Sequence, residues 1–113
     1  MYINIIIGGV KIETEEITQI SKALSDKNRV EIIKLLSDKE LCACKLLEHF
    51  EIKQPTLSHH MKTLVDTGLV HVTKKSTWSY YTLNNEKLNE FKEFIEDCME
   101  YKYSLETDNC GCK

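Results

Sequence analysis

The sequence predicts a mainly α-helical domain that carries one small β-hairpin. Apolar residues recur at helical spacing in five segments, and Gln54-Pro55 separates two short ones in the middle of the chain. Two runs rich in β-branched and aromatic residues follow, 70–73 and 78–83, and the fifth helical segment comes after them. Two short helices followed by such a hairpin make a winged helix-turn-helix, in the order α-α-α-α-β-β-α.

The first two helices are expected to begin near Thr14 and near Asp26. Thr14-Glu15-Glu16 is typical of a capped helix start, and an apolar stripe runs along each segment. The stripe residues are Ile17, Ile20 and Leu24 in the first helix, and Val30, Ile33 and Leu36 in the second.

The third helix is expected from Leu41 or Cys42 to Phe50, and the fourth, from Pro55 to Thr67, is the candidate reading helix. Pro55 suits a first helical position because it has no N–H group to leave unpaired, and Gly68 suits the C-terminal cap. The apolar stripe of the reading helix consists of Leu57, Met61, Leu64 and Val65.

The opposite face of the reading helix is polar, as in a helix that enters a DNA groove. The only arginine, Arg29, lies in the second helix, so bidentate arginine–guanine contacts from the reading helix are not available. We therefore expect Gln54, Thr56, Ser58 and His59 to read bases, and Lys62, Lys74 and Lys75 to contact phosphates. For His60, which flanks the apolar stripe, a packed and satisfied imidazole is expected rather than a metal ligand.

The distribution of charge indicates the same region as the DNA-binding surface. The whole chain of 113 residues has a net charge of −3, but residues 53–85 carry four lysines against one aspartate, a local charge of +3. The two basic wing residues lie in Lys74-Lys75-Ser76-Thr77, between the two strand-forming runs. The glycine usual in such a wing is absent, which leaves the type of turn open.

The first and last helices carry more apolar surface than one small domain can cover. The last helix begins at Asn84-Asn85, and exposed stripes of this kind mark a partner surface. The expected interface residues are Ile17, Ile20, Leu24, Leu88, Phe91 and Ile95. We divide the chain into an N-terminal arm of unassigned role (1–12), the winged-helix and dimerisation domain (13–104) and a tail (105–113).

Five cysteines without a secretory signal indicate a reducing compartment, so a cytoplasmic protein is expected. The apolar run at residues 1–7 is too short to span a membrane, so no membrane partner is expected. The C-x-x-C redox motif, a Gly-rich phosphate loop and a site of paired carboxylates are all absent, and we therefore predict that the chain is not an enzyme and has no catalytic cofactor.

Four of the cysteines form two C-x-C pairs, Cys42 with Cys44 and Cys110 with Cys112. Residues i and i+2 of a regular helix diverge by about 200°, so Cys42 and Cys44 bind one ion only if the third helix begins irregularly or unwinds. Thiolates select soft ions: three suit a trigonal site for arsenite or lead, and four suit tetrahedral cadmium or zinc. The alternative is that these cysteines are small buried hydrophobes. We favour that alternative for Cys98, which lies on the apolar stripe of the last helix.

Four stretches, in this order and spacing, resemble the ArsR/SmtB family of metal-responsive repressors. They are 40–46 (ELCACKL), 54–60 (QPTLSHH), Leu69-Val70 and 78–83 (WSYYTL). The resemblance implies a homodimer built from the first and last helices. The arsenic-responsive branch has a third cysteine where this chain has Leu47. The cadmium- and lead-responsive branch takes further cysteines from an N-terminal segment, which here contains none. The zinc branch uses histidines of the last helix, and residues 86–105 contain none, which disfavours zinc sensing there.

The resulting hypothesis is a homodimeric repressor that binds double-stranded operator DNA and releases it when thiolates capture a soft metal(loid). Arsenite or antimonite is favoured as inducer, with cadmium or lead next. A redox or persulfide trigger at the same cysteines is the alternative, and a thiol enzyme is a remote one. The particular ion, the operator and the regulated genes are left open.

Overall fold

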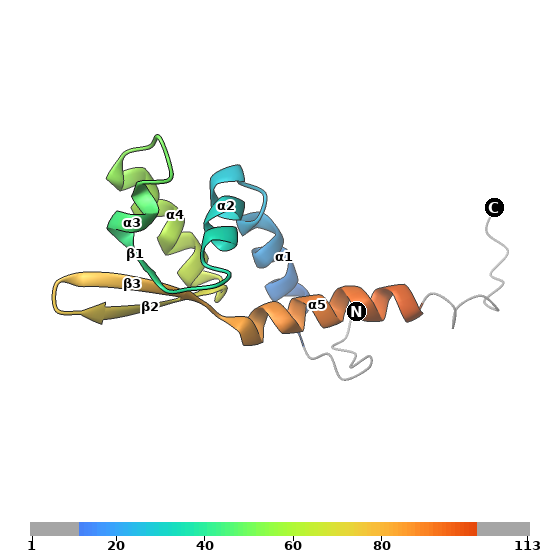
Figure 1. Ribbon diagram of the computed structural model, residues 1–113. Coiled ribbons are helices and arrows are strands. Elements are labelled where there is room, and N and C mark those ends of the chain that lie inside the picture. Colours follow the sequence, from blue (N-terminus) through green and yellow to red (C-terminus); the bar gives the residue numbers. More distant parts are fainter. Residues whose placement is uncertain (1–11, 102–113) are drawn as a thin grey trace, which may run out of the picture.

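The computed structural model describes residues 12–101. Within them the predicted winged helix-turn-helix is confirmed, with α3 and α4 as the helix-turn-helix and β2–β3 as the wing (Figure 1). The elements in chain order are α1 (Thr14–Ala23), α2 (Lys27–Leu35), β1 (Leu41–Cys42), α3 (Ala43–Leu47), α4 (Gln54–Asp66), β2 (Val70–Lys75), β3 (Trp78–Leu83) and α5 (Asn85–Tyr101). The tail at 105–113, with Cys110 and Cys112, lies outside the described residues, as does all of the arm except Ile12.

The sheet has one strand more than the sequence predicted. Leu41 and Cys42, expected to begin a helix, form the short strand β1, which pairs with β3 in a sheet of order β1-β3-β2. All neighbouring strands are antiparallel. Helix α3 therefore begins only at Ala43 and is five residues long, ending at Leu47 rather than Phe50.

Local capping explains where the first helices begin. The backbone N–H of Glu13 donates to Glu16 Oε1 over 3.1 Å ahead of α1, and Asp26 caps α2 by accepting from Asn28 N and Arg29 N at 2.8 and 3.2 Å. The inward face of α2 differs from the expected one. Val30, which we expected inside, is 37% exposed, whereas Ile32 is 0% exposed.

Two residues fix how α4 leads into the wing and then into α5. Gly68 has φ +85°. The N–H of Gly68 donates to the Val65 carbonyl, and the N–H of Leu69 donates to the Leu64 carbonyl. These two hydrogen bonds end α4 in a Schellman motif. The Asn84 side chain donates to the Gly68 carbonyl over 2.8 Å and accepts from the N–H of Lys87 in the first turn of α5. The loop after α4 thus holds the start of α5.

The core lies where α1, α2, α3 and α4 meet the base of the wing. Its buried apolar residues are Ile20, Ala23, Ile32, Leu36, Leu46, Leu57, Met61, Leu64, Leu69 and Val70. Ile20 is only 1% exposed, so this residue, which we expected at a dimer interface, has essentially no surface left for a partner. The expected stripe of the reading helix is confirmed at Leu57, Met61 and Leu64, whereas Val65 is only half-buried.

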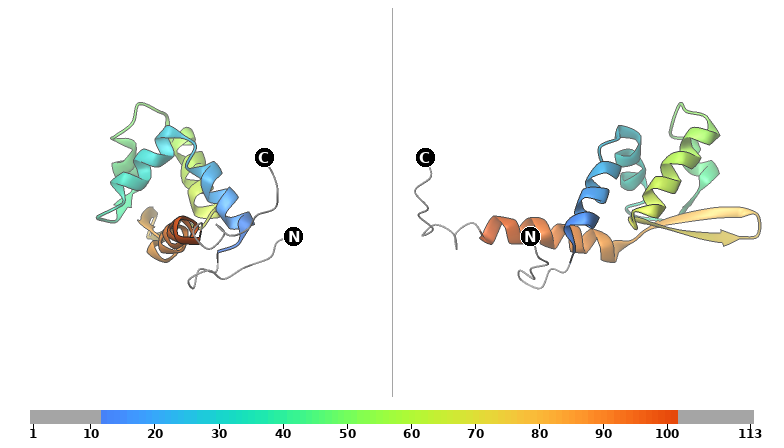
Figure 2. Two further views of the ribbon diagram at one scale, coloured as in Figure 1. Left: turned by 90° about the vertical axis from the view of Figure 1, so that its right-hand side faces the viewer. Right: turned by 180° about the vertical axis from the view of Figure 1, so that it is seen from behind.

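The wing and α5 leave the helical body in opposite directions, and the last turns of α5 extend past the other helices (Figure 2). Leu88 and Phe91 in the first half of α5 pack against the core, and Lys87 forms an ion pair with Glu16 of α1 at 2.9 Å. Among the described residues, no helix is both long and apolar enough to cross a membrane.

Candidate nucleic-acid interface and thiol site

Helix α4 has one buried face and one exposed face. All five α4 residues that we expected to contact DNA have exposed side chains: Gln54, Thr56, Ser58, His59 and Lys62. Lys62 also pairs with Asp66 one turn later, at 2.9 Å. This ion pair is exposed, so it contributes little to stability and leaves Lys62 able to turn toward a phosphate.

The wing lies beside this exposed face. Lys74 and Lys75, which we expected at the tip, are the last residues of β2, and Ser76-Thr77 alone form the turn. Ser76 has φ +61°, and a positive φ at the first of two loop residues is the pattern of a type II′ turn. Ser58 and Lys62 of α4 and Lys74 of β2 line one hollow, so helix and wing present their polar groups together.

Lys75, next to the turn of the wing, makes two side-chain contacts. Its ammonium group lies 3.0 Å from Glu40 Oε1 and 4.7 Å from the centre of the Tyr80 ring. Neither Glu40 nor Tyr80 was identified from the sequence as part of the site. Lys75 and Glu40 are 35 residues apart along the chain, and no local sequence pattern predicts such a pair.

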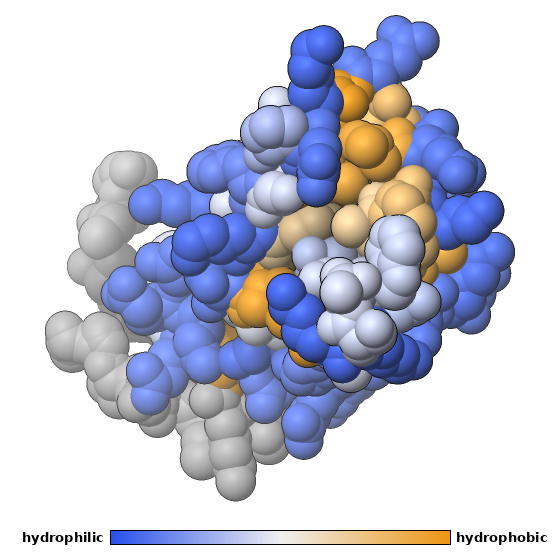
Figure 3. Space-filling model, turned by 90° about the vertical axis from the view of Figure 1, so that its left-hand side faces the viewer, coloured by the Kyte–Doolittle hydropathy of each residue, from blue (hydrophilic) through white to orange (hydrophobic). Residues whose placement is uncertain are grey.

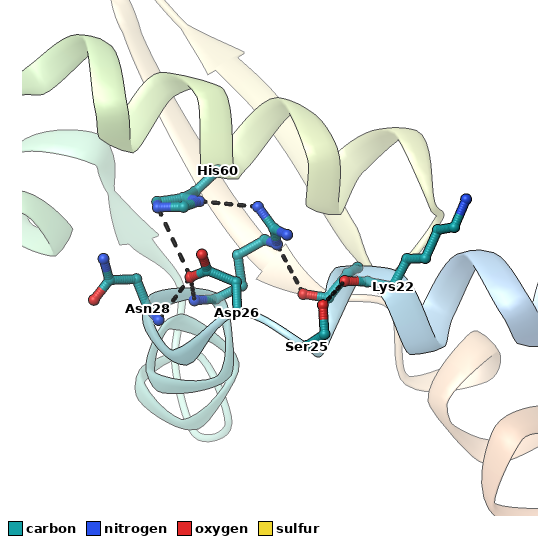
Figure 4. A network of polar contacts seen from close by, with 7 residues as sticks. Lys22, Ser25, Asp26, Asn28 and His60 are labelled. Atoms are coloured by element: carbon teal, nitrogen blue, oxygen red, sulfur yellow. Dashed lines mark hydrogen bonds and ion pairs between the residues drawn. The ribbon is translucent and has the colours of Figure 1, made fainter.

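His60 is the buried polar residue of α4, at 6% exposed, and the expectation of a packed, satisfied histidine is confirmed. Figure 4 shows its ring between α4 and the corner that joins α1 to α2. Arg29 Nη1 lies 3.1 Å from His60 Nδ1, and Arg29 Nε donates to the Ala23 carbonyl over 2.7 Å. Because a guanidinium only donates, Nδ1 is the acceptor and the ring proton is on Nε2, 3.9 Å from Asp26 Oδ1.

Burial lowers the pKa of His60, because the charged ring would lose its hydration. The nearby Asp26 carboxylate opposes this shift, and the Arg29 charge adds to it. A neutral imidazole is therefore the form that fits the contact with Arg29. This arrangement gives the single arginine a structural role, connecting α2 to the buried side of α4.

The thiols of Cys42 and Cys44 are brought together without unwinding of α3. Cys42 lies in extended backbone, at φ −83° and ψ 164°, as the residue that precedes the helix, and Cys44 lies in the first turn. Their Sγ atoms are 2.7 Å apart. The irregular helix start that a shared ion requires is thus already present, because β1 holds Cys42 extended against β3.

The two thiols are electrostatically unequal. The hydrogen bond from the Cys44 thiol lowers the pKa of Cys42, and the backbone N–H of Lys45 contributes in the same direction. The same thiol–thiol contact raises the pKa of Cys44, because that group is the donor. Cys42 is therefore the thiol that ionises first, and a thiolate is the form that attacks or binds a soft ion.

The two thiols are suitable ligands for a soft metal(loid) ion, but a trigonal site needs three ligands and a tetrahedral site needs four. Across residues 12–101 no group of three or more His, Cys, Asp or Glu side chains converges as a metal site would. Cys98, which we expected to be packed in the core, is instead exposed on α5. Whether Cys110 or Cys112 approaches the pair lies outside the described residues.

The second half of α5 exposes apolar side chains. Ile95 is 44% exposed and Met99 is 62% exposed, while Leu88 and Phe91 are partly covered by the protomer's own core. The three α5 residues that we predicted for the interface therefore differ in the surface they offer to a partner, and Ile95 is the most exposed of them.

Comparison with known proteins agrees with this architecture. Residues 26–72 match the family model described as "Bacterial regulatory protein, arsR family". The chain is 46% identical over 99 residues to an arsenical resistance operon repressor of Staphylococcus xylosus, which covers 88% of this chain and 90% of that protein. It is 34% identical over 79 residues to a homologue of a cadmium resistance transcriptional regulatory protein of Staphylococcus aureus, covering 69% and 65% of the two chains.

A solved structure of an ArsR family transcriptional regulator has the same fold, with a TM-score of 0.75 at 20% identity over 82% of this chain and 96% of that one. These relatives and this fold are those of DNA-binding regulators and not of enzymes, as the sequence predicted. The chain belongs to the ArsR family of bacterial regulatory proteins.

Proposed function

We propose that this protein is a homodimeric repressor that releases operator DNA when Cys42 and Cys44 capture a soft metal(loid). The observation that carries the proposal is the contact between the two thiols, 2.7 Å apart at the start of α3. Arsenite or antimonite is the favoured inducer, because a relative that matches 88% of the chain is an arsenical resistance operon repressor. Cadmium or lead is next, in keeping with the cadmium regulator.

In the proposed complex, α4 enters the major groove with its exposed polar face, and the wing lies along the backbone. Gln54, Thr56, Ser58 and His59 contact base edges, whereas Lys62, Lys74 and Lys75 contact phosphates. A two-fold dimer would place two such helices on a palindromic operator. The exposed apolar half of α5, with Ile95 and Met99, supports a second copy as the partner.

Metal(loid) capture would act through β1. A bound ion supplies a fixed link between the two sulfurs, which sets the backbone of Cys42 relative to that of Cys44. Cys42 is paired with β3 of the wing, and Cys44 lies in the helix that packs on α4. Any change in this spacing therefore reaches both proposed DNA-contacting elements. Further thiolates from Cys110 and Cys112 would complete a trigonal or tetrahedral ligand set.

The experiment is a titration of operator release with reduced protein and arsenite, antimonite, cadmium, lead or zinc. Fluorescence anisotropy of labelled operator DNA would report release. Arsenite or antimonite should act at the lowest concentration, and zinc at the highest. Operator binding that none of these ions reverses would contradict the proposal.

A redox trigger is the second candidate, because two thiols in contact are also placed to react with each other or with a persulfide. In that case an oxidant should release the operator, and a dithiol reductant should restore binding. Release by arsenite under fully reducing conditions separates the two triggers.

A further inference from the structure

Two large apolar side chains of the wing are exposed in the protomer. Trp78, the first residue of β3, is 53% exposed, and Val72 of β2 is 41% exposed. Neither residue was identified from the sequence as part of the DNA-binding surface. Single exposed apolar residues are common on protein surfaces, so the position of these two decides whether they have a role.

Both side chains lie beside the exposed face of the reading helix. Trp78 lines a hollow together with Gln54 and Ser58 of α4. Val72 lines a second hollow together with Ser58 and Lys62. Figure 3 shows this end of the molecule, where residues of apolar and intermediate hydropathy are bordered by hydrophilic ones. The α4 residues in these hollows are ones that we assign to bases and phosphates, so a DNA duplex bound there would cover the two wing residues.

The neighbours of Trp78 restrict which part of the duplex it would meet. Trp78 lies directly opposite Lys75 in the pairing of β2 with β3, so the two side chains are on the same face of the wing. Lys74 and Lys75 are assigned to phosphates, and along a DNA strand one deoxyribose separates each phosphate from the next. The carbon atoms of that sugar are the apolar part of the backbone, and an indole ring has a large apolar surface to place against them.

We propose that Trp78 packs against a deoxyribose of the DNA backbone, beside the phosphates that the wing lysines bind. The proposal rests on the proposed function, because it adds a residue to the same DNA-binding surface. Unlike a lysine, an indole releases no counterion from a phosphate, so its contact adds affinity that does not vary with salt. Because every nucleotide carries the sugar, the contact is also independent of the DNA sequence.

The first test uses the protein's own fluorescence. Trp78 is the only tryptophan of the chain, so tryptophan emission reports on this side chain alone. On titration with operator DNA, the emission should be quenched or shift to shorter wavelength, because the half-exposed indole leaves water. Unchanged emission at a DNA concentration that saturates the anisotropy of labelled operator would overturn the proposal.

The second test replaces the side chain. Trp78→Ala should weaken binding to operator and to an unrelated duplex of equal length by the same factor, about tenfold, since the exposed half of the ring is no longer buried. The plot of log affinity against log salt should shift without a change of slope, and Trp78→Phe should retain most of the affinity. Val30→Ala, at an apolar position of α2 that is 37% exposed, is the control and should bind DNA as wild type does.

The possible outcomes separate this proposal from the proposed function. A loss of affinity confined to the operator would show that Trp78 contacts a base, and a changed slope would show that it acts through the wing lysines. Either result, or wild-type affinity in a Trp78→Ala variant that circular dichroism shows to be folded, would overturn the sugar contact and leave the proposed function standing. Failure of the wild-type protein to bind DNA would overturn both.

Discussion

Cys42 lies directly opposite Tyr80 in the antiparallel pairing of β1 with β3. The Tyr80 ring also lies against the ammonium group of Lys75, which forms an ion pair with Glu40, two residues before Cys42. The thiol pair and the wing are therefore joined by a closed set of contacts: a strand pairing, a cation–π contact and an ion pair. A displacement of Cys42 can reach the wing without passing through α4.

Glu40 neutralises a wing lysine that we assign to a phosphate. Glu40→Gln should therefore raise operator affinity and make its salt dependence steeper, because Lys75 is released from its partner. Stability should change by less than about 0.5 kcal/mol, since the ion pair is exposed. Operator affinity measured over a range of salt concentrations checks this. Glu31→Gln, which breaks an exposed ion pair with Lys34 on α2, is the control, and equal slopes for wild type and Glu40→Gln would contradict the expectation.

The wing lysines should contribute to DNA affinity in a way that does not depend on the DNA sequence. Replacing both Lys74 and Lys75 with Ala should flatten the plot of log affinity against log salt by up to two phosphate contacts, each worth about 0.9 in slope. Affinity for operator and for unrelated DNA should fall together. Lys92→Ala, on α5, is the matched control. A slope unchanged in the double variant would show that the wing does not contact DNA.

Ile95 tests whether α5 carries the dimer interface. Ile95→Glu should yield monomers that remain folded, because this side chain is 44% exposed in the protomer and the new charge would be buried only in a dimer. Phe91→Glu should instead destabilise the fold, since Phe91 packs against the core. Sedimentation velocity and circular dichroism distinguish the two. Lys92→Glu changes charge on the same helix and should remain dimeric, whereas a stable Ile95→Glu dimer would place the interface elsewhere.

The His60 cluster should make stability depend on pH. The pKa of His60 is lowered in the folded protein, so the unfolded chain takes up its proton first as pH falls. The stabilising contribution is complete above the ordinary histidine pKa and declines as pH drops below it, toward the lower pKa of the folded state. Urea unfolding across this range measures the decline. His60→Gln should reduce it, whereas His71→Gln, at an exposed position on β2, should not. Equal pH dependence in all three proteins would contradict the cluster's role.

Much of the fold could be predicted because its signals are local. The stripe of α4, the cap at Asp26 and the positive φ at Gly68 each depend on residues within one or two turns. Strand β1 could not be predicted, because two residues carry no strand pattern and are extended only by pairing with Tyr80 and Tyr81. The prediction that Val30 faces inward on α2 was wrong. Apolar residues occur on more than one face of this helix, and only packing against the other helices determines that Ile32 is the buried one.

For the candidate site, the sequence indicated the types of residue but not the contacts between distant segments. The polar face of α4 and the C-x-C pair follow from helical angles and thiol chemistry. The contact between the two thiols follows from β1, and the partners of Lys75 and His60 come from segments more than thirty residues away. No periodic pattern encodes such pairs, because they depend on how α2, β1 and the wing are placed by the core.

Under the proposed function, capture of a metal(loid) by Cys42 and Cys44 controls DNA binding. The most direct test measures operator affinity by fluorescence anisotropy, with and without arsenite, for wild type, Cys42→Ser, Cys44→Ser and the control Cys98→Ser. Arsenite should weaken operator binding of wild type and Cys98→Ser by roughly 5- to 150-fold, the range of a coupling free energy of about 1–3 kcal/mol. Cys42→Ser and Cys44→Ser should bind operator normally and show no release. Full release in both of these variants would contradict the account and move the trigger to other cysteines.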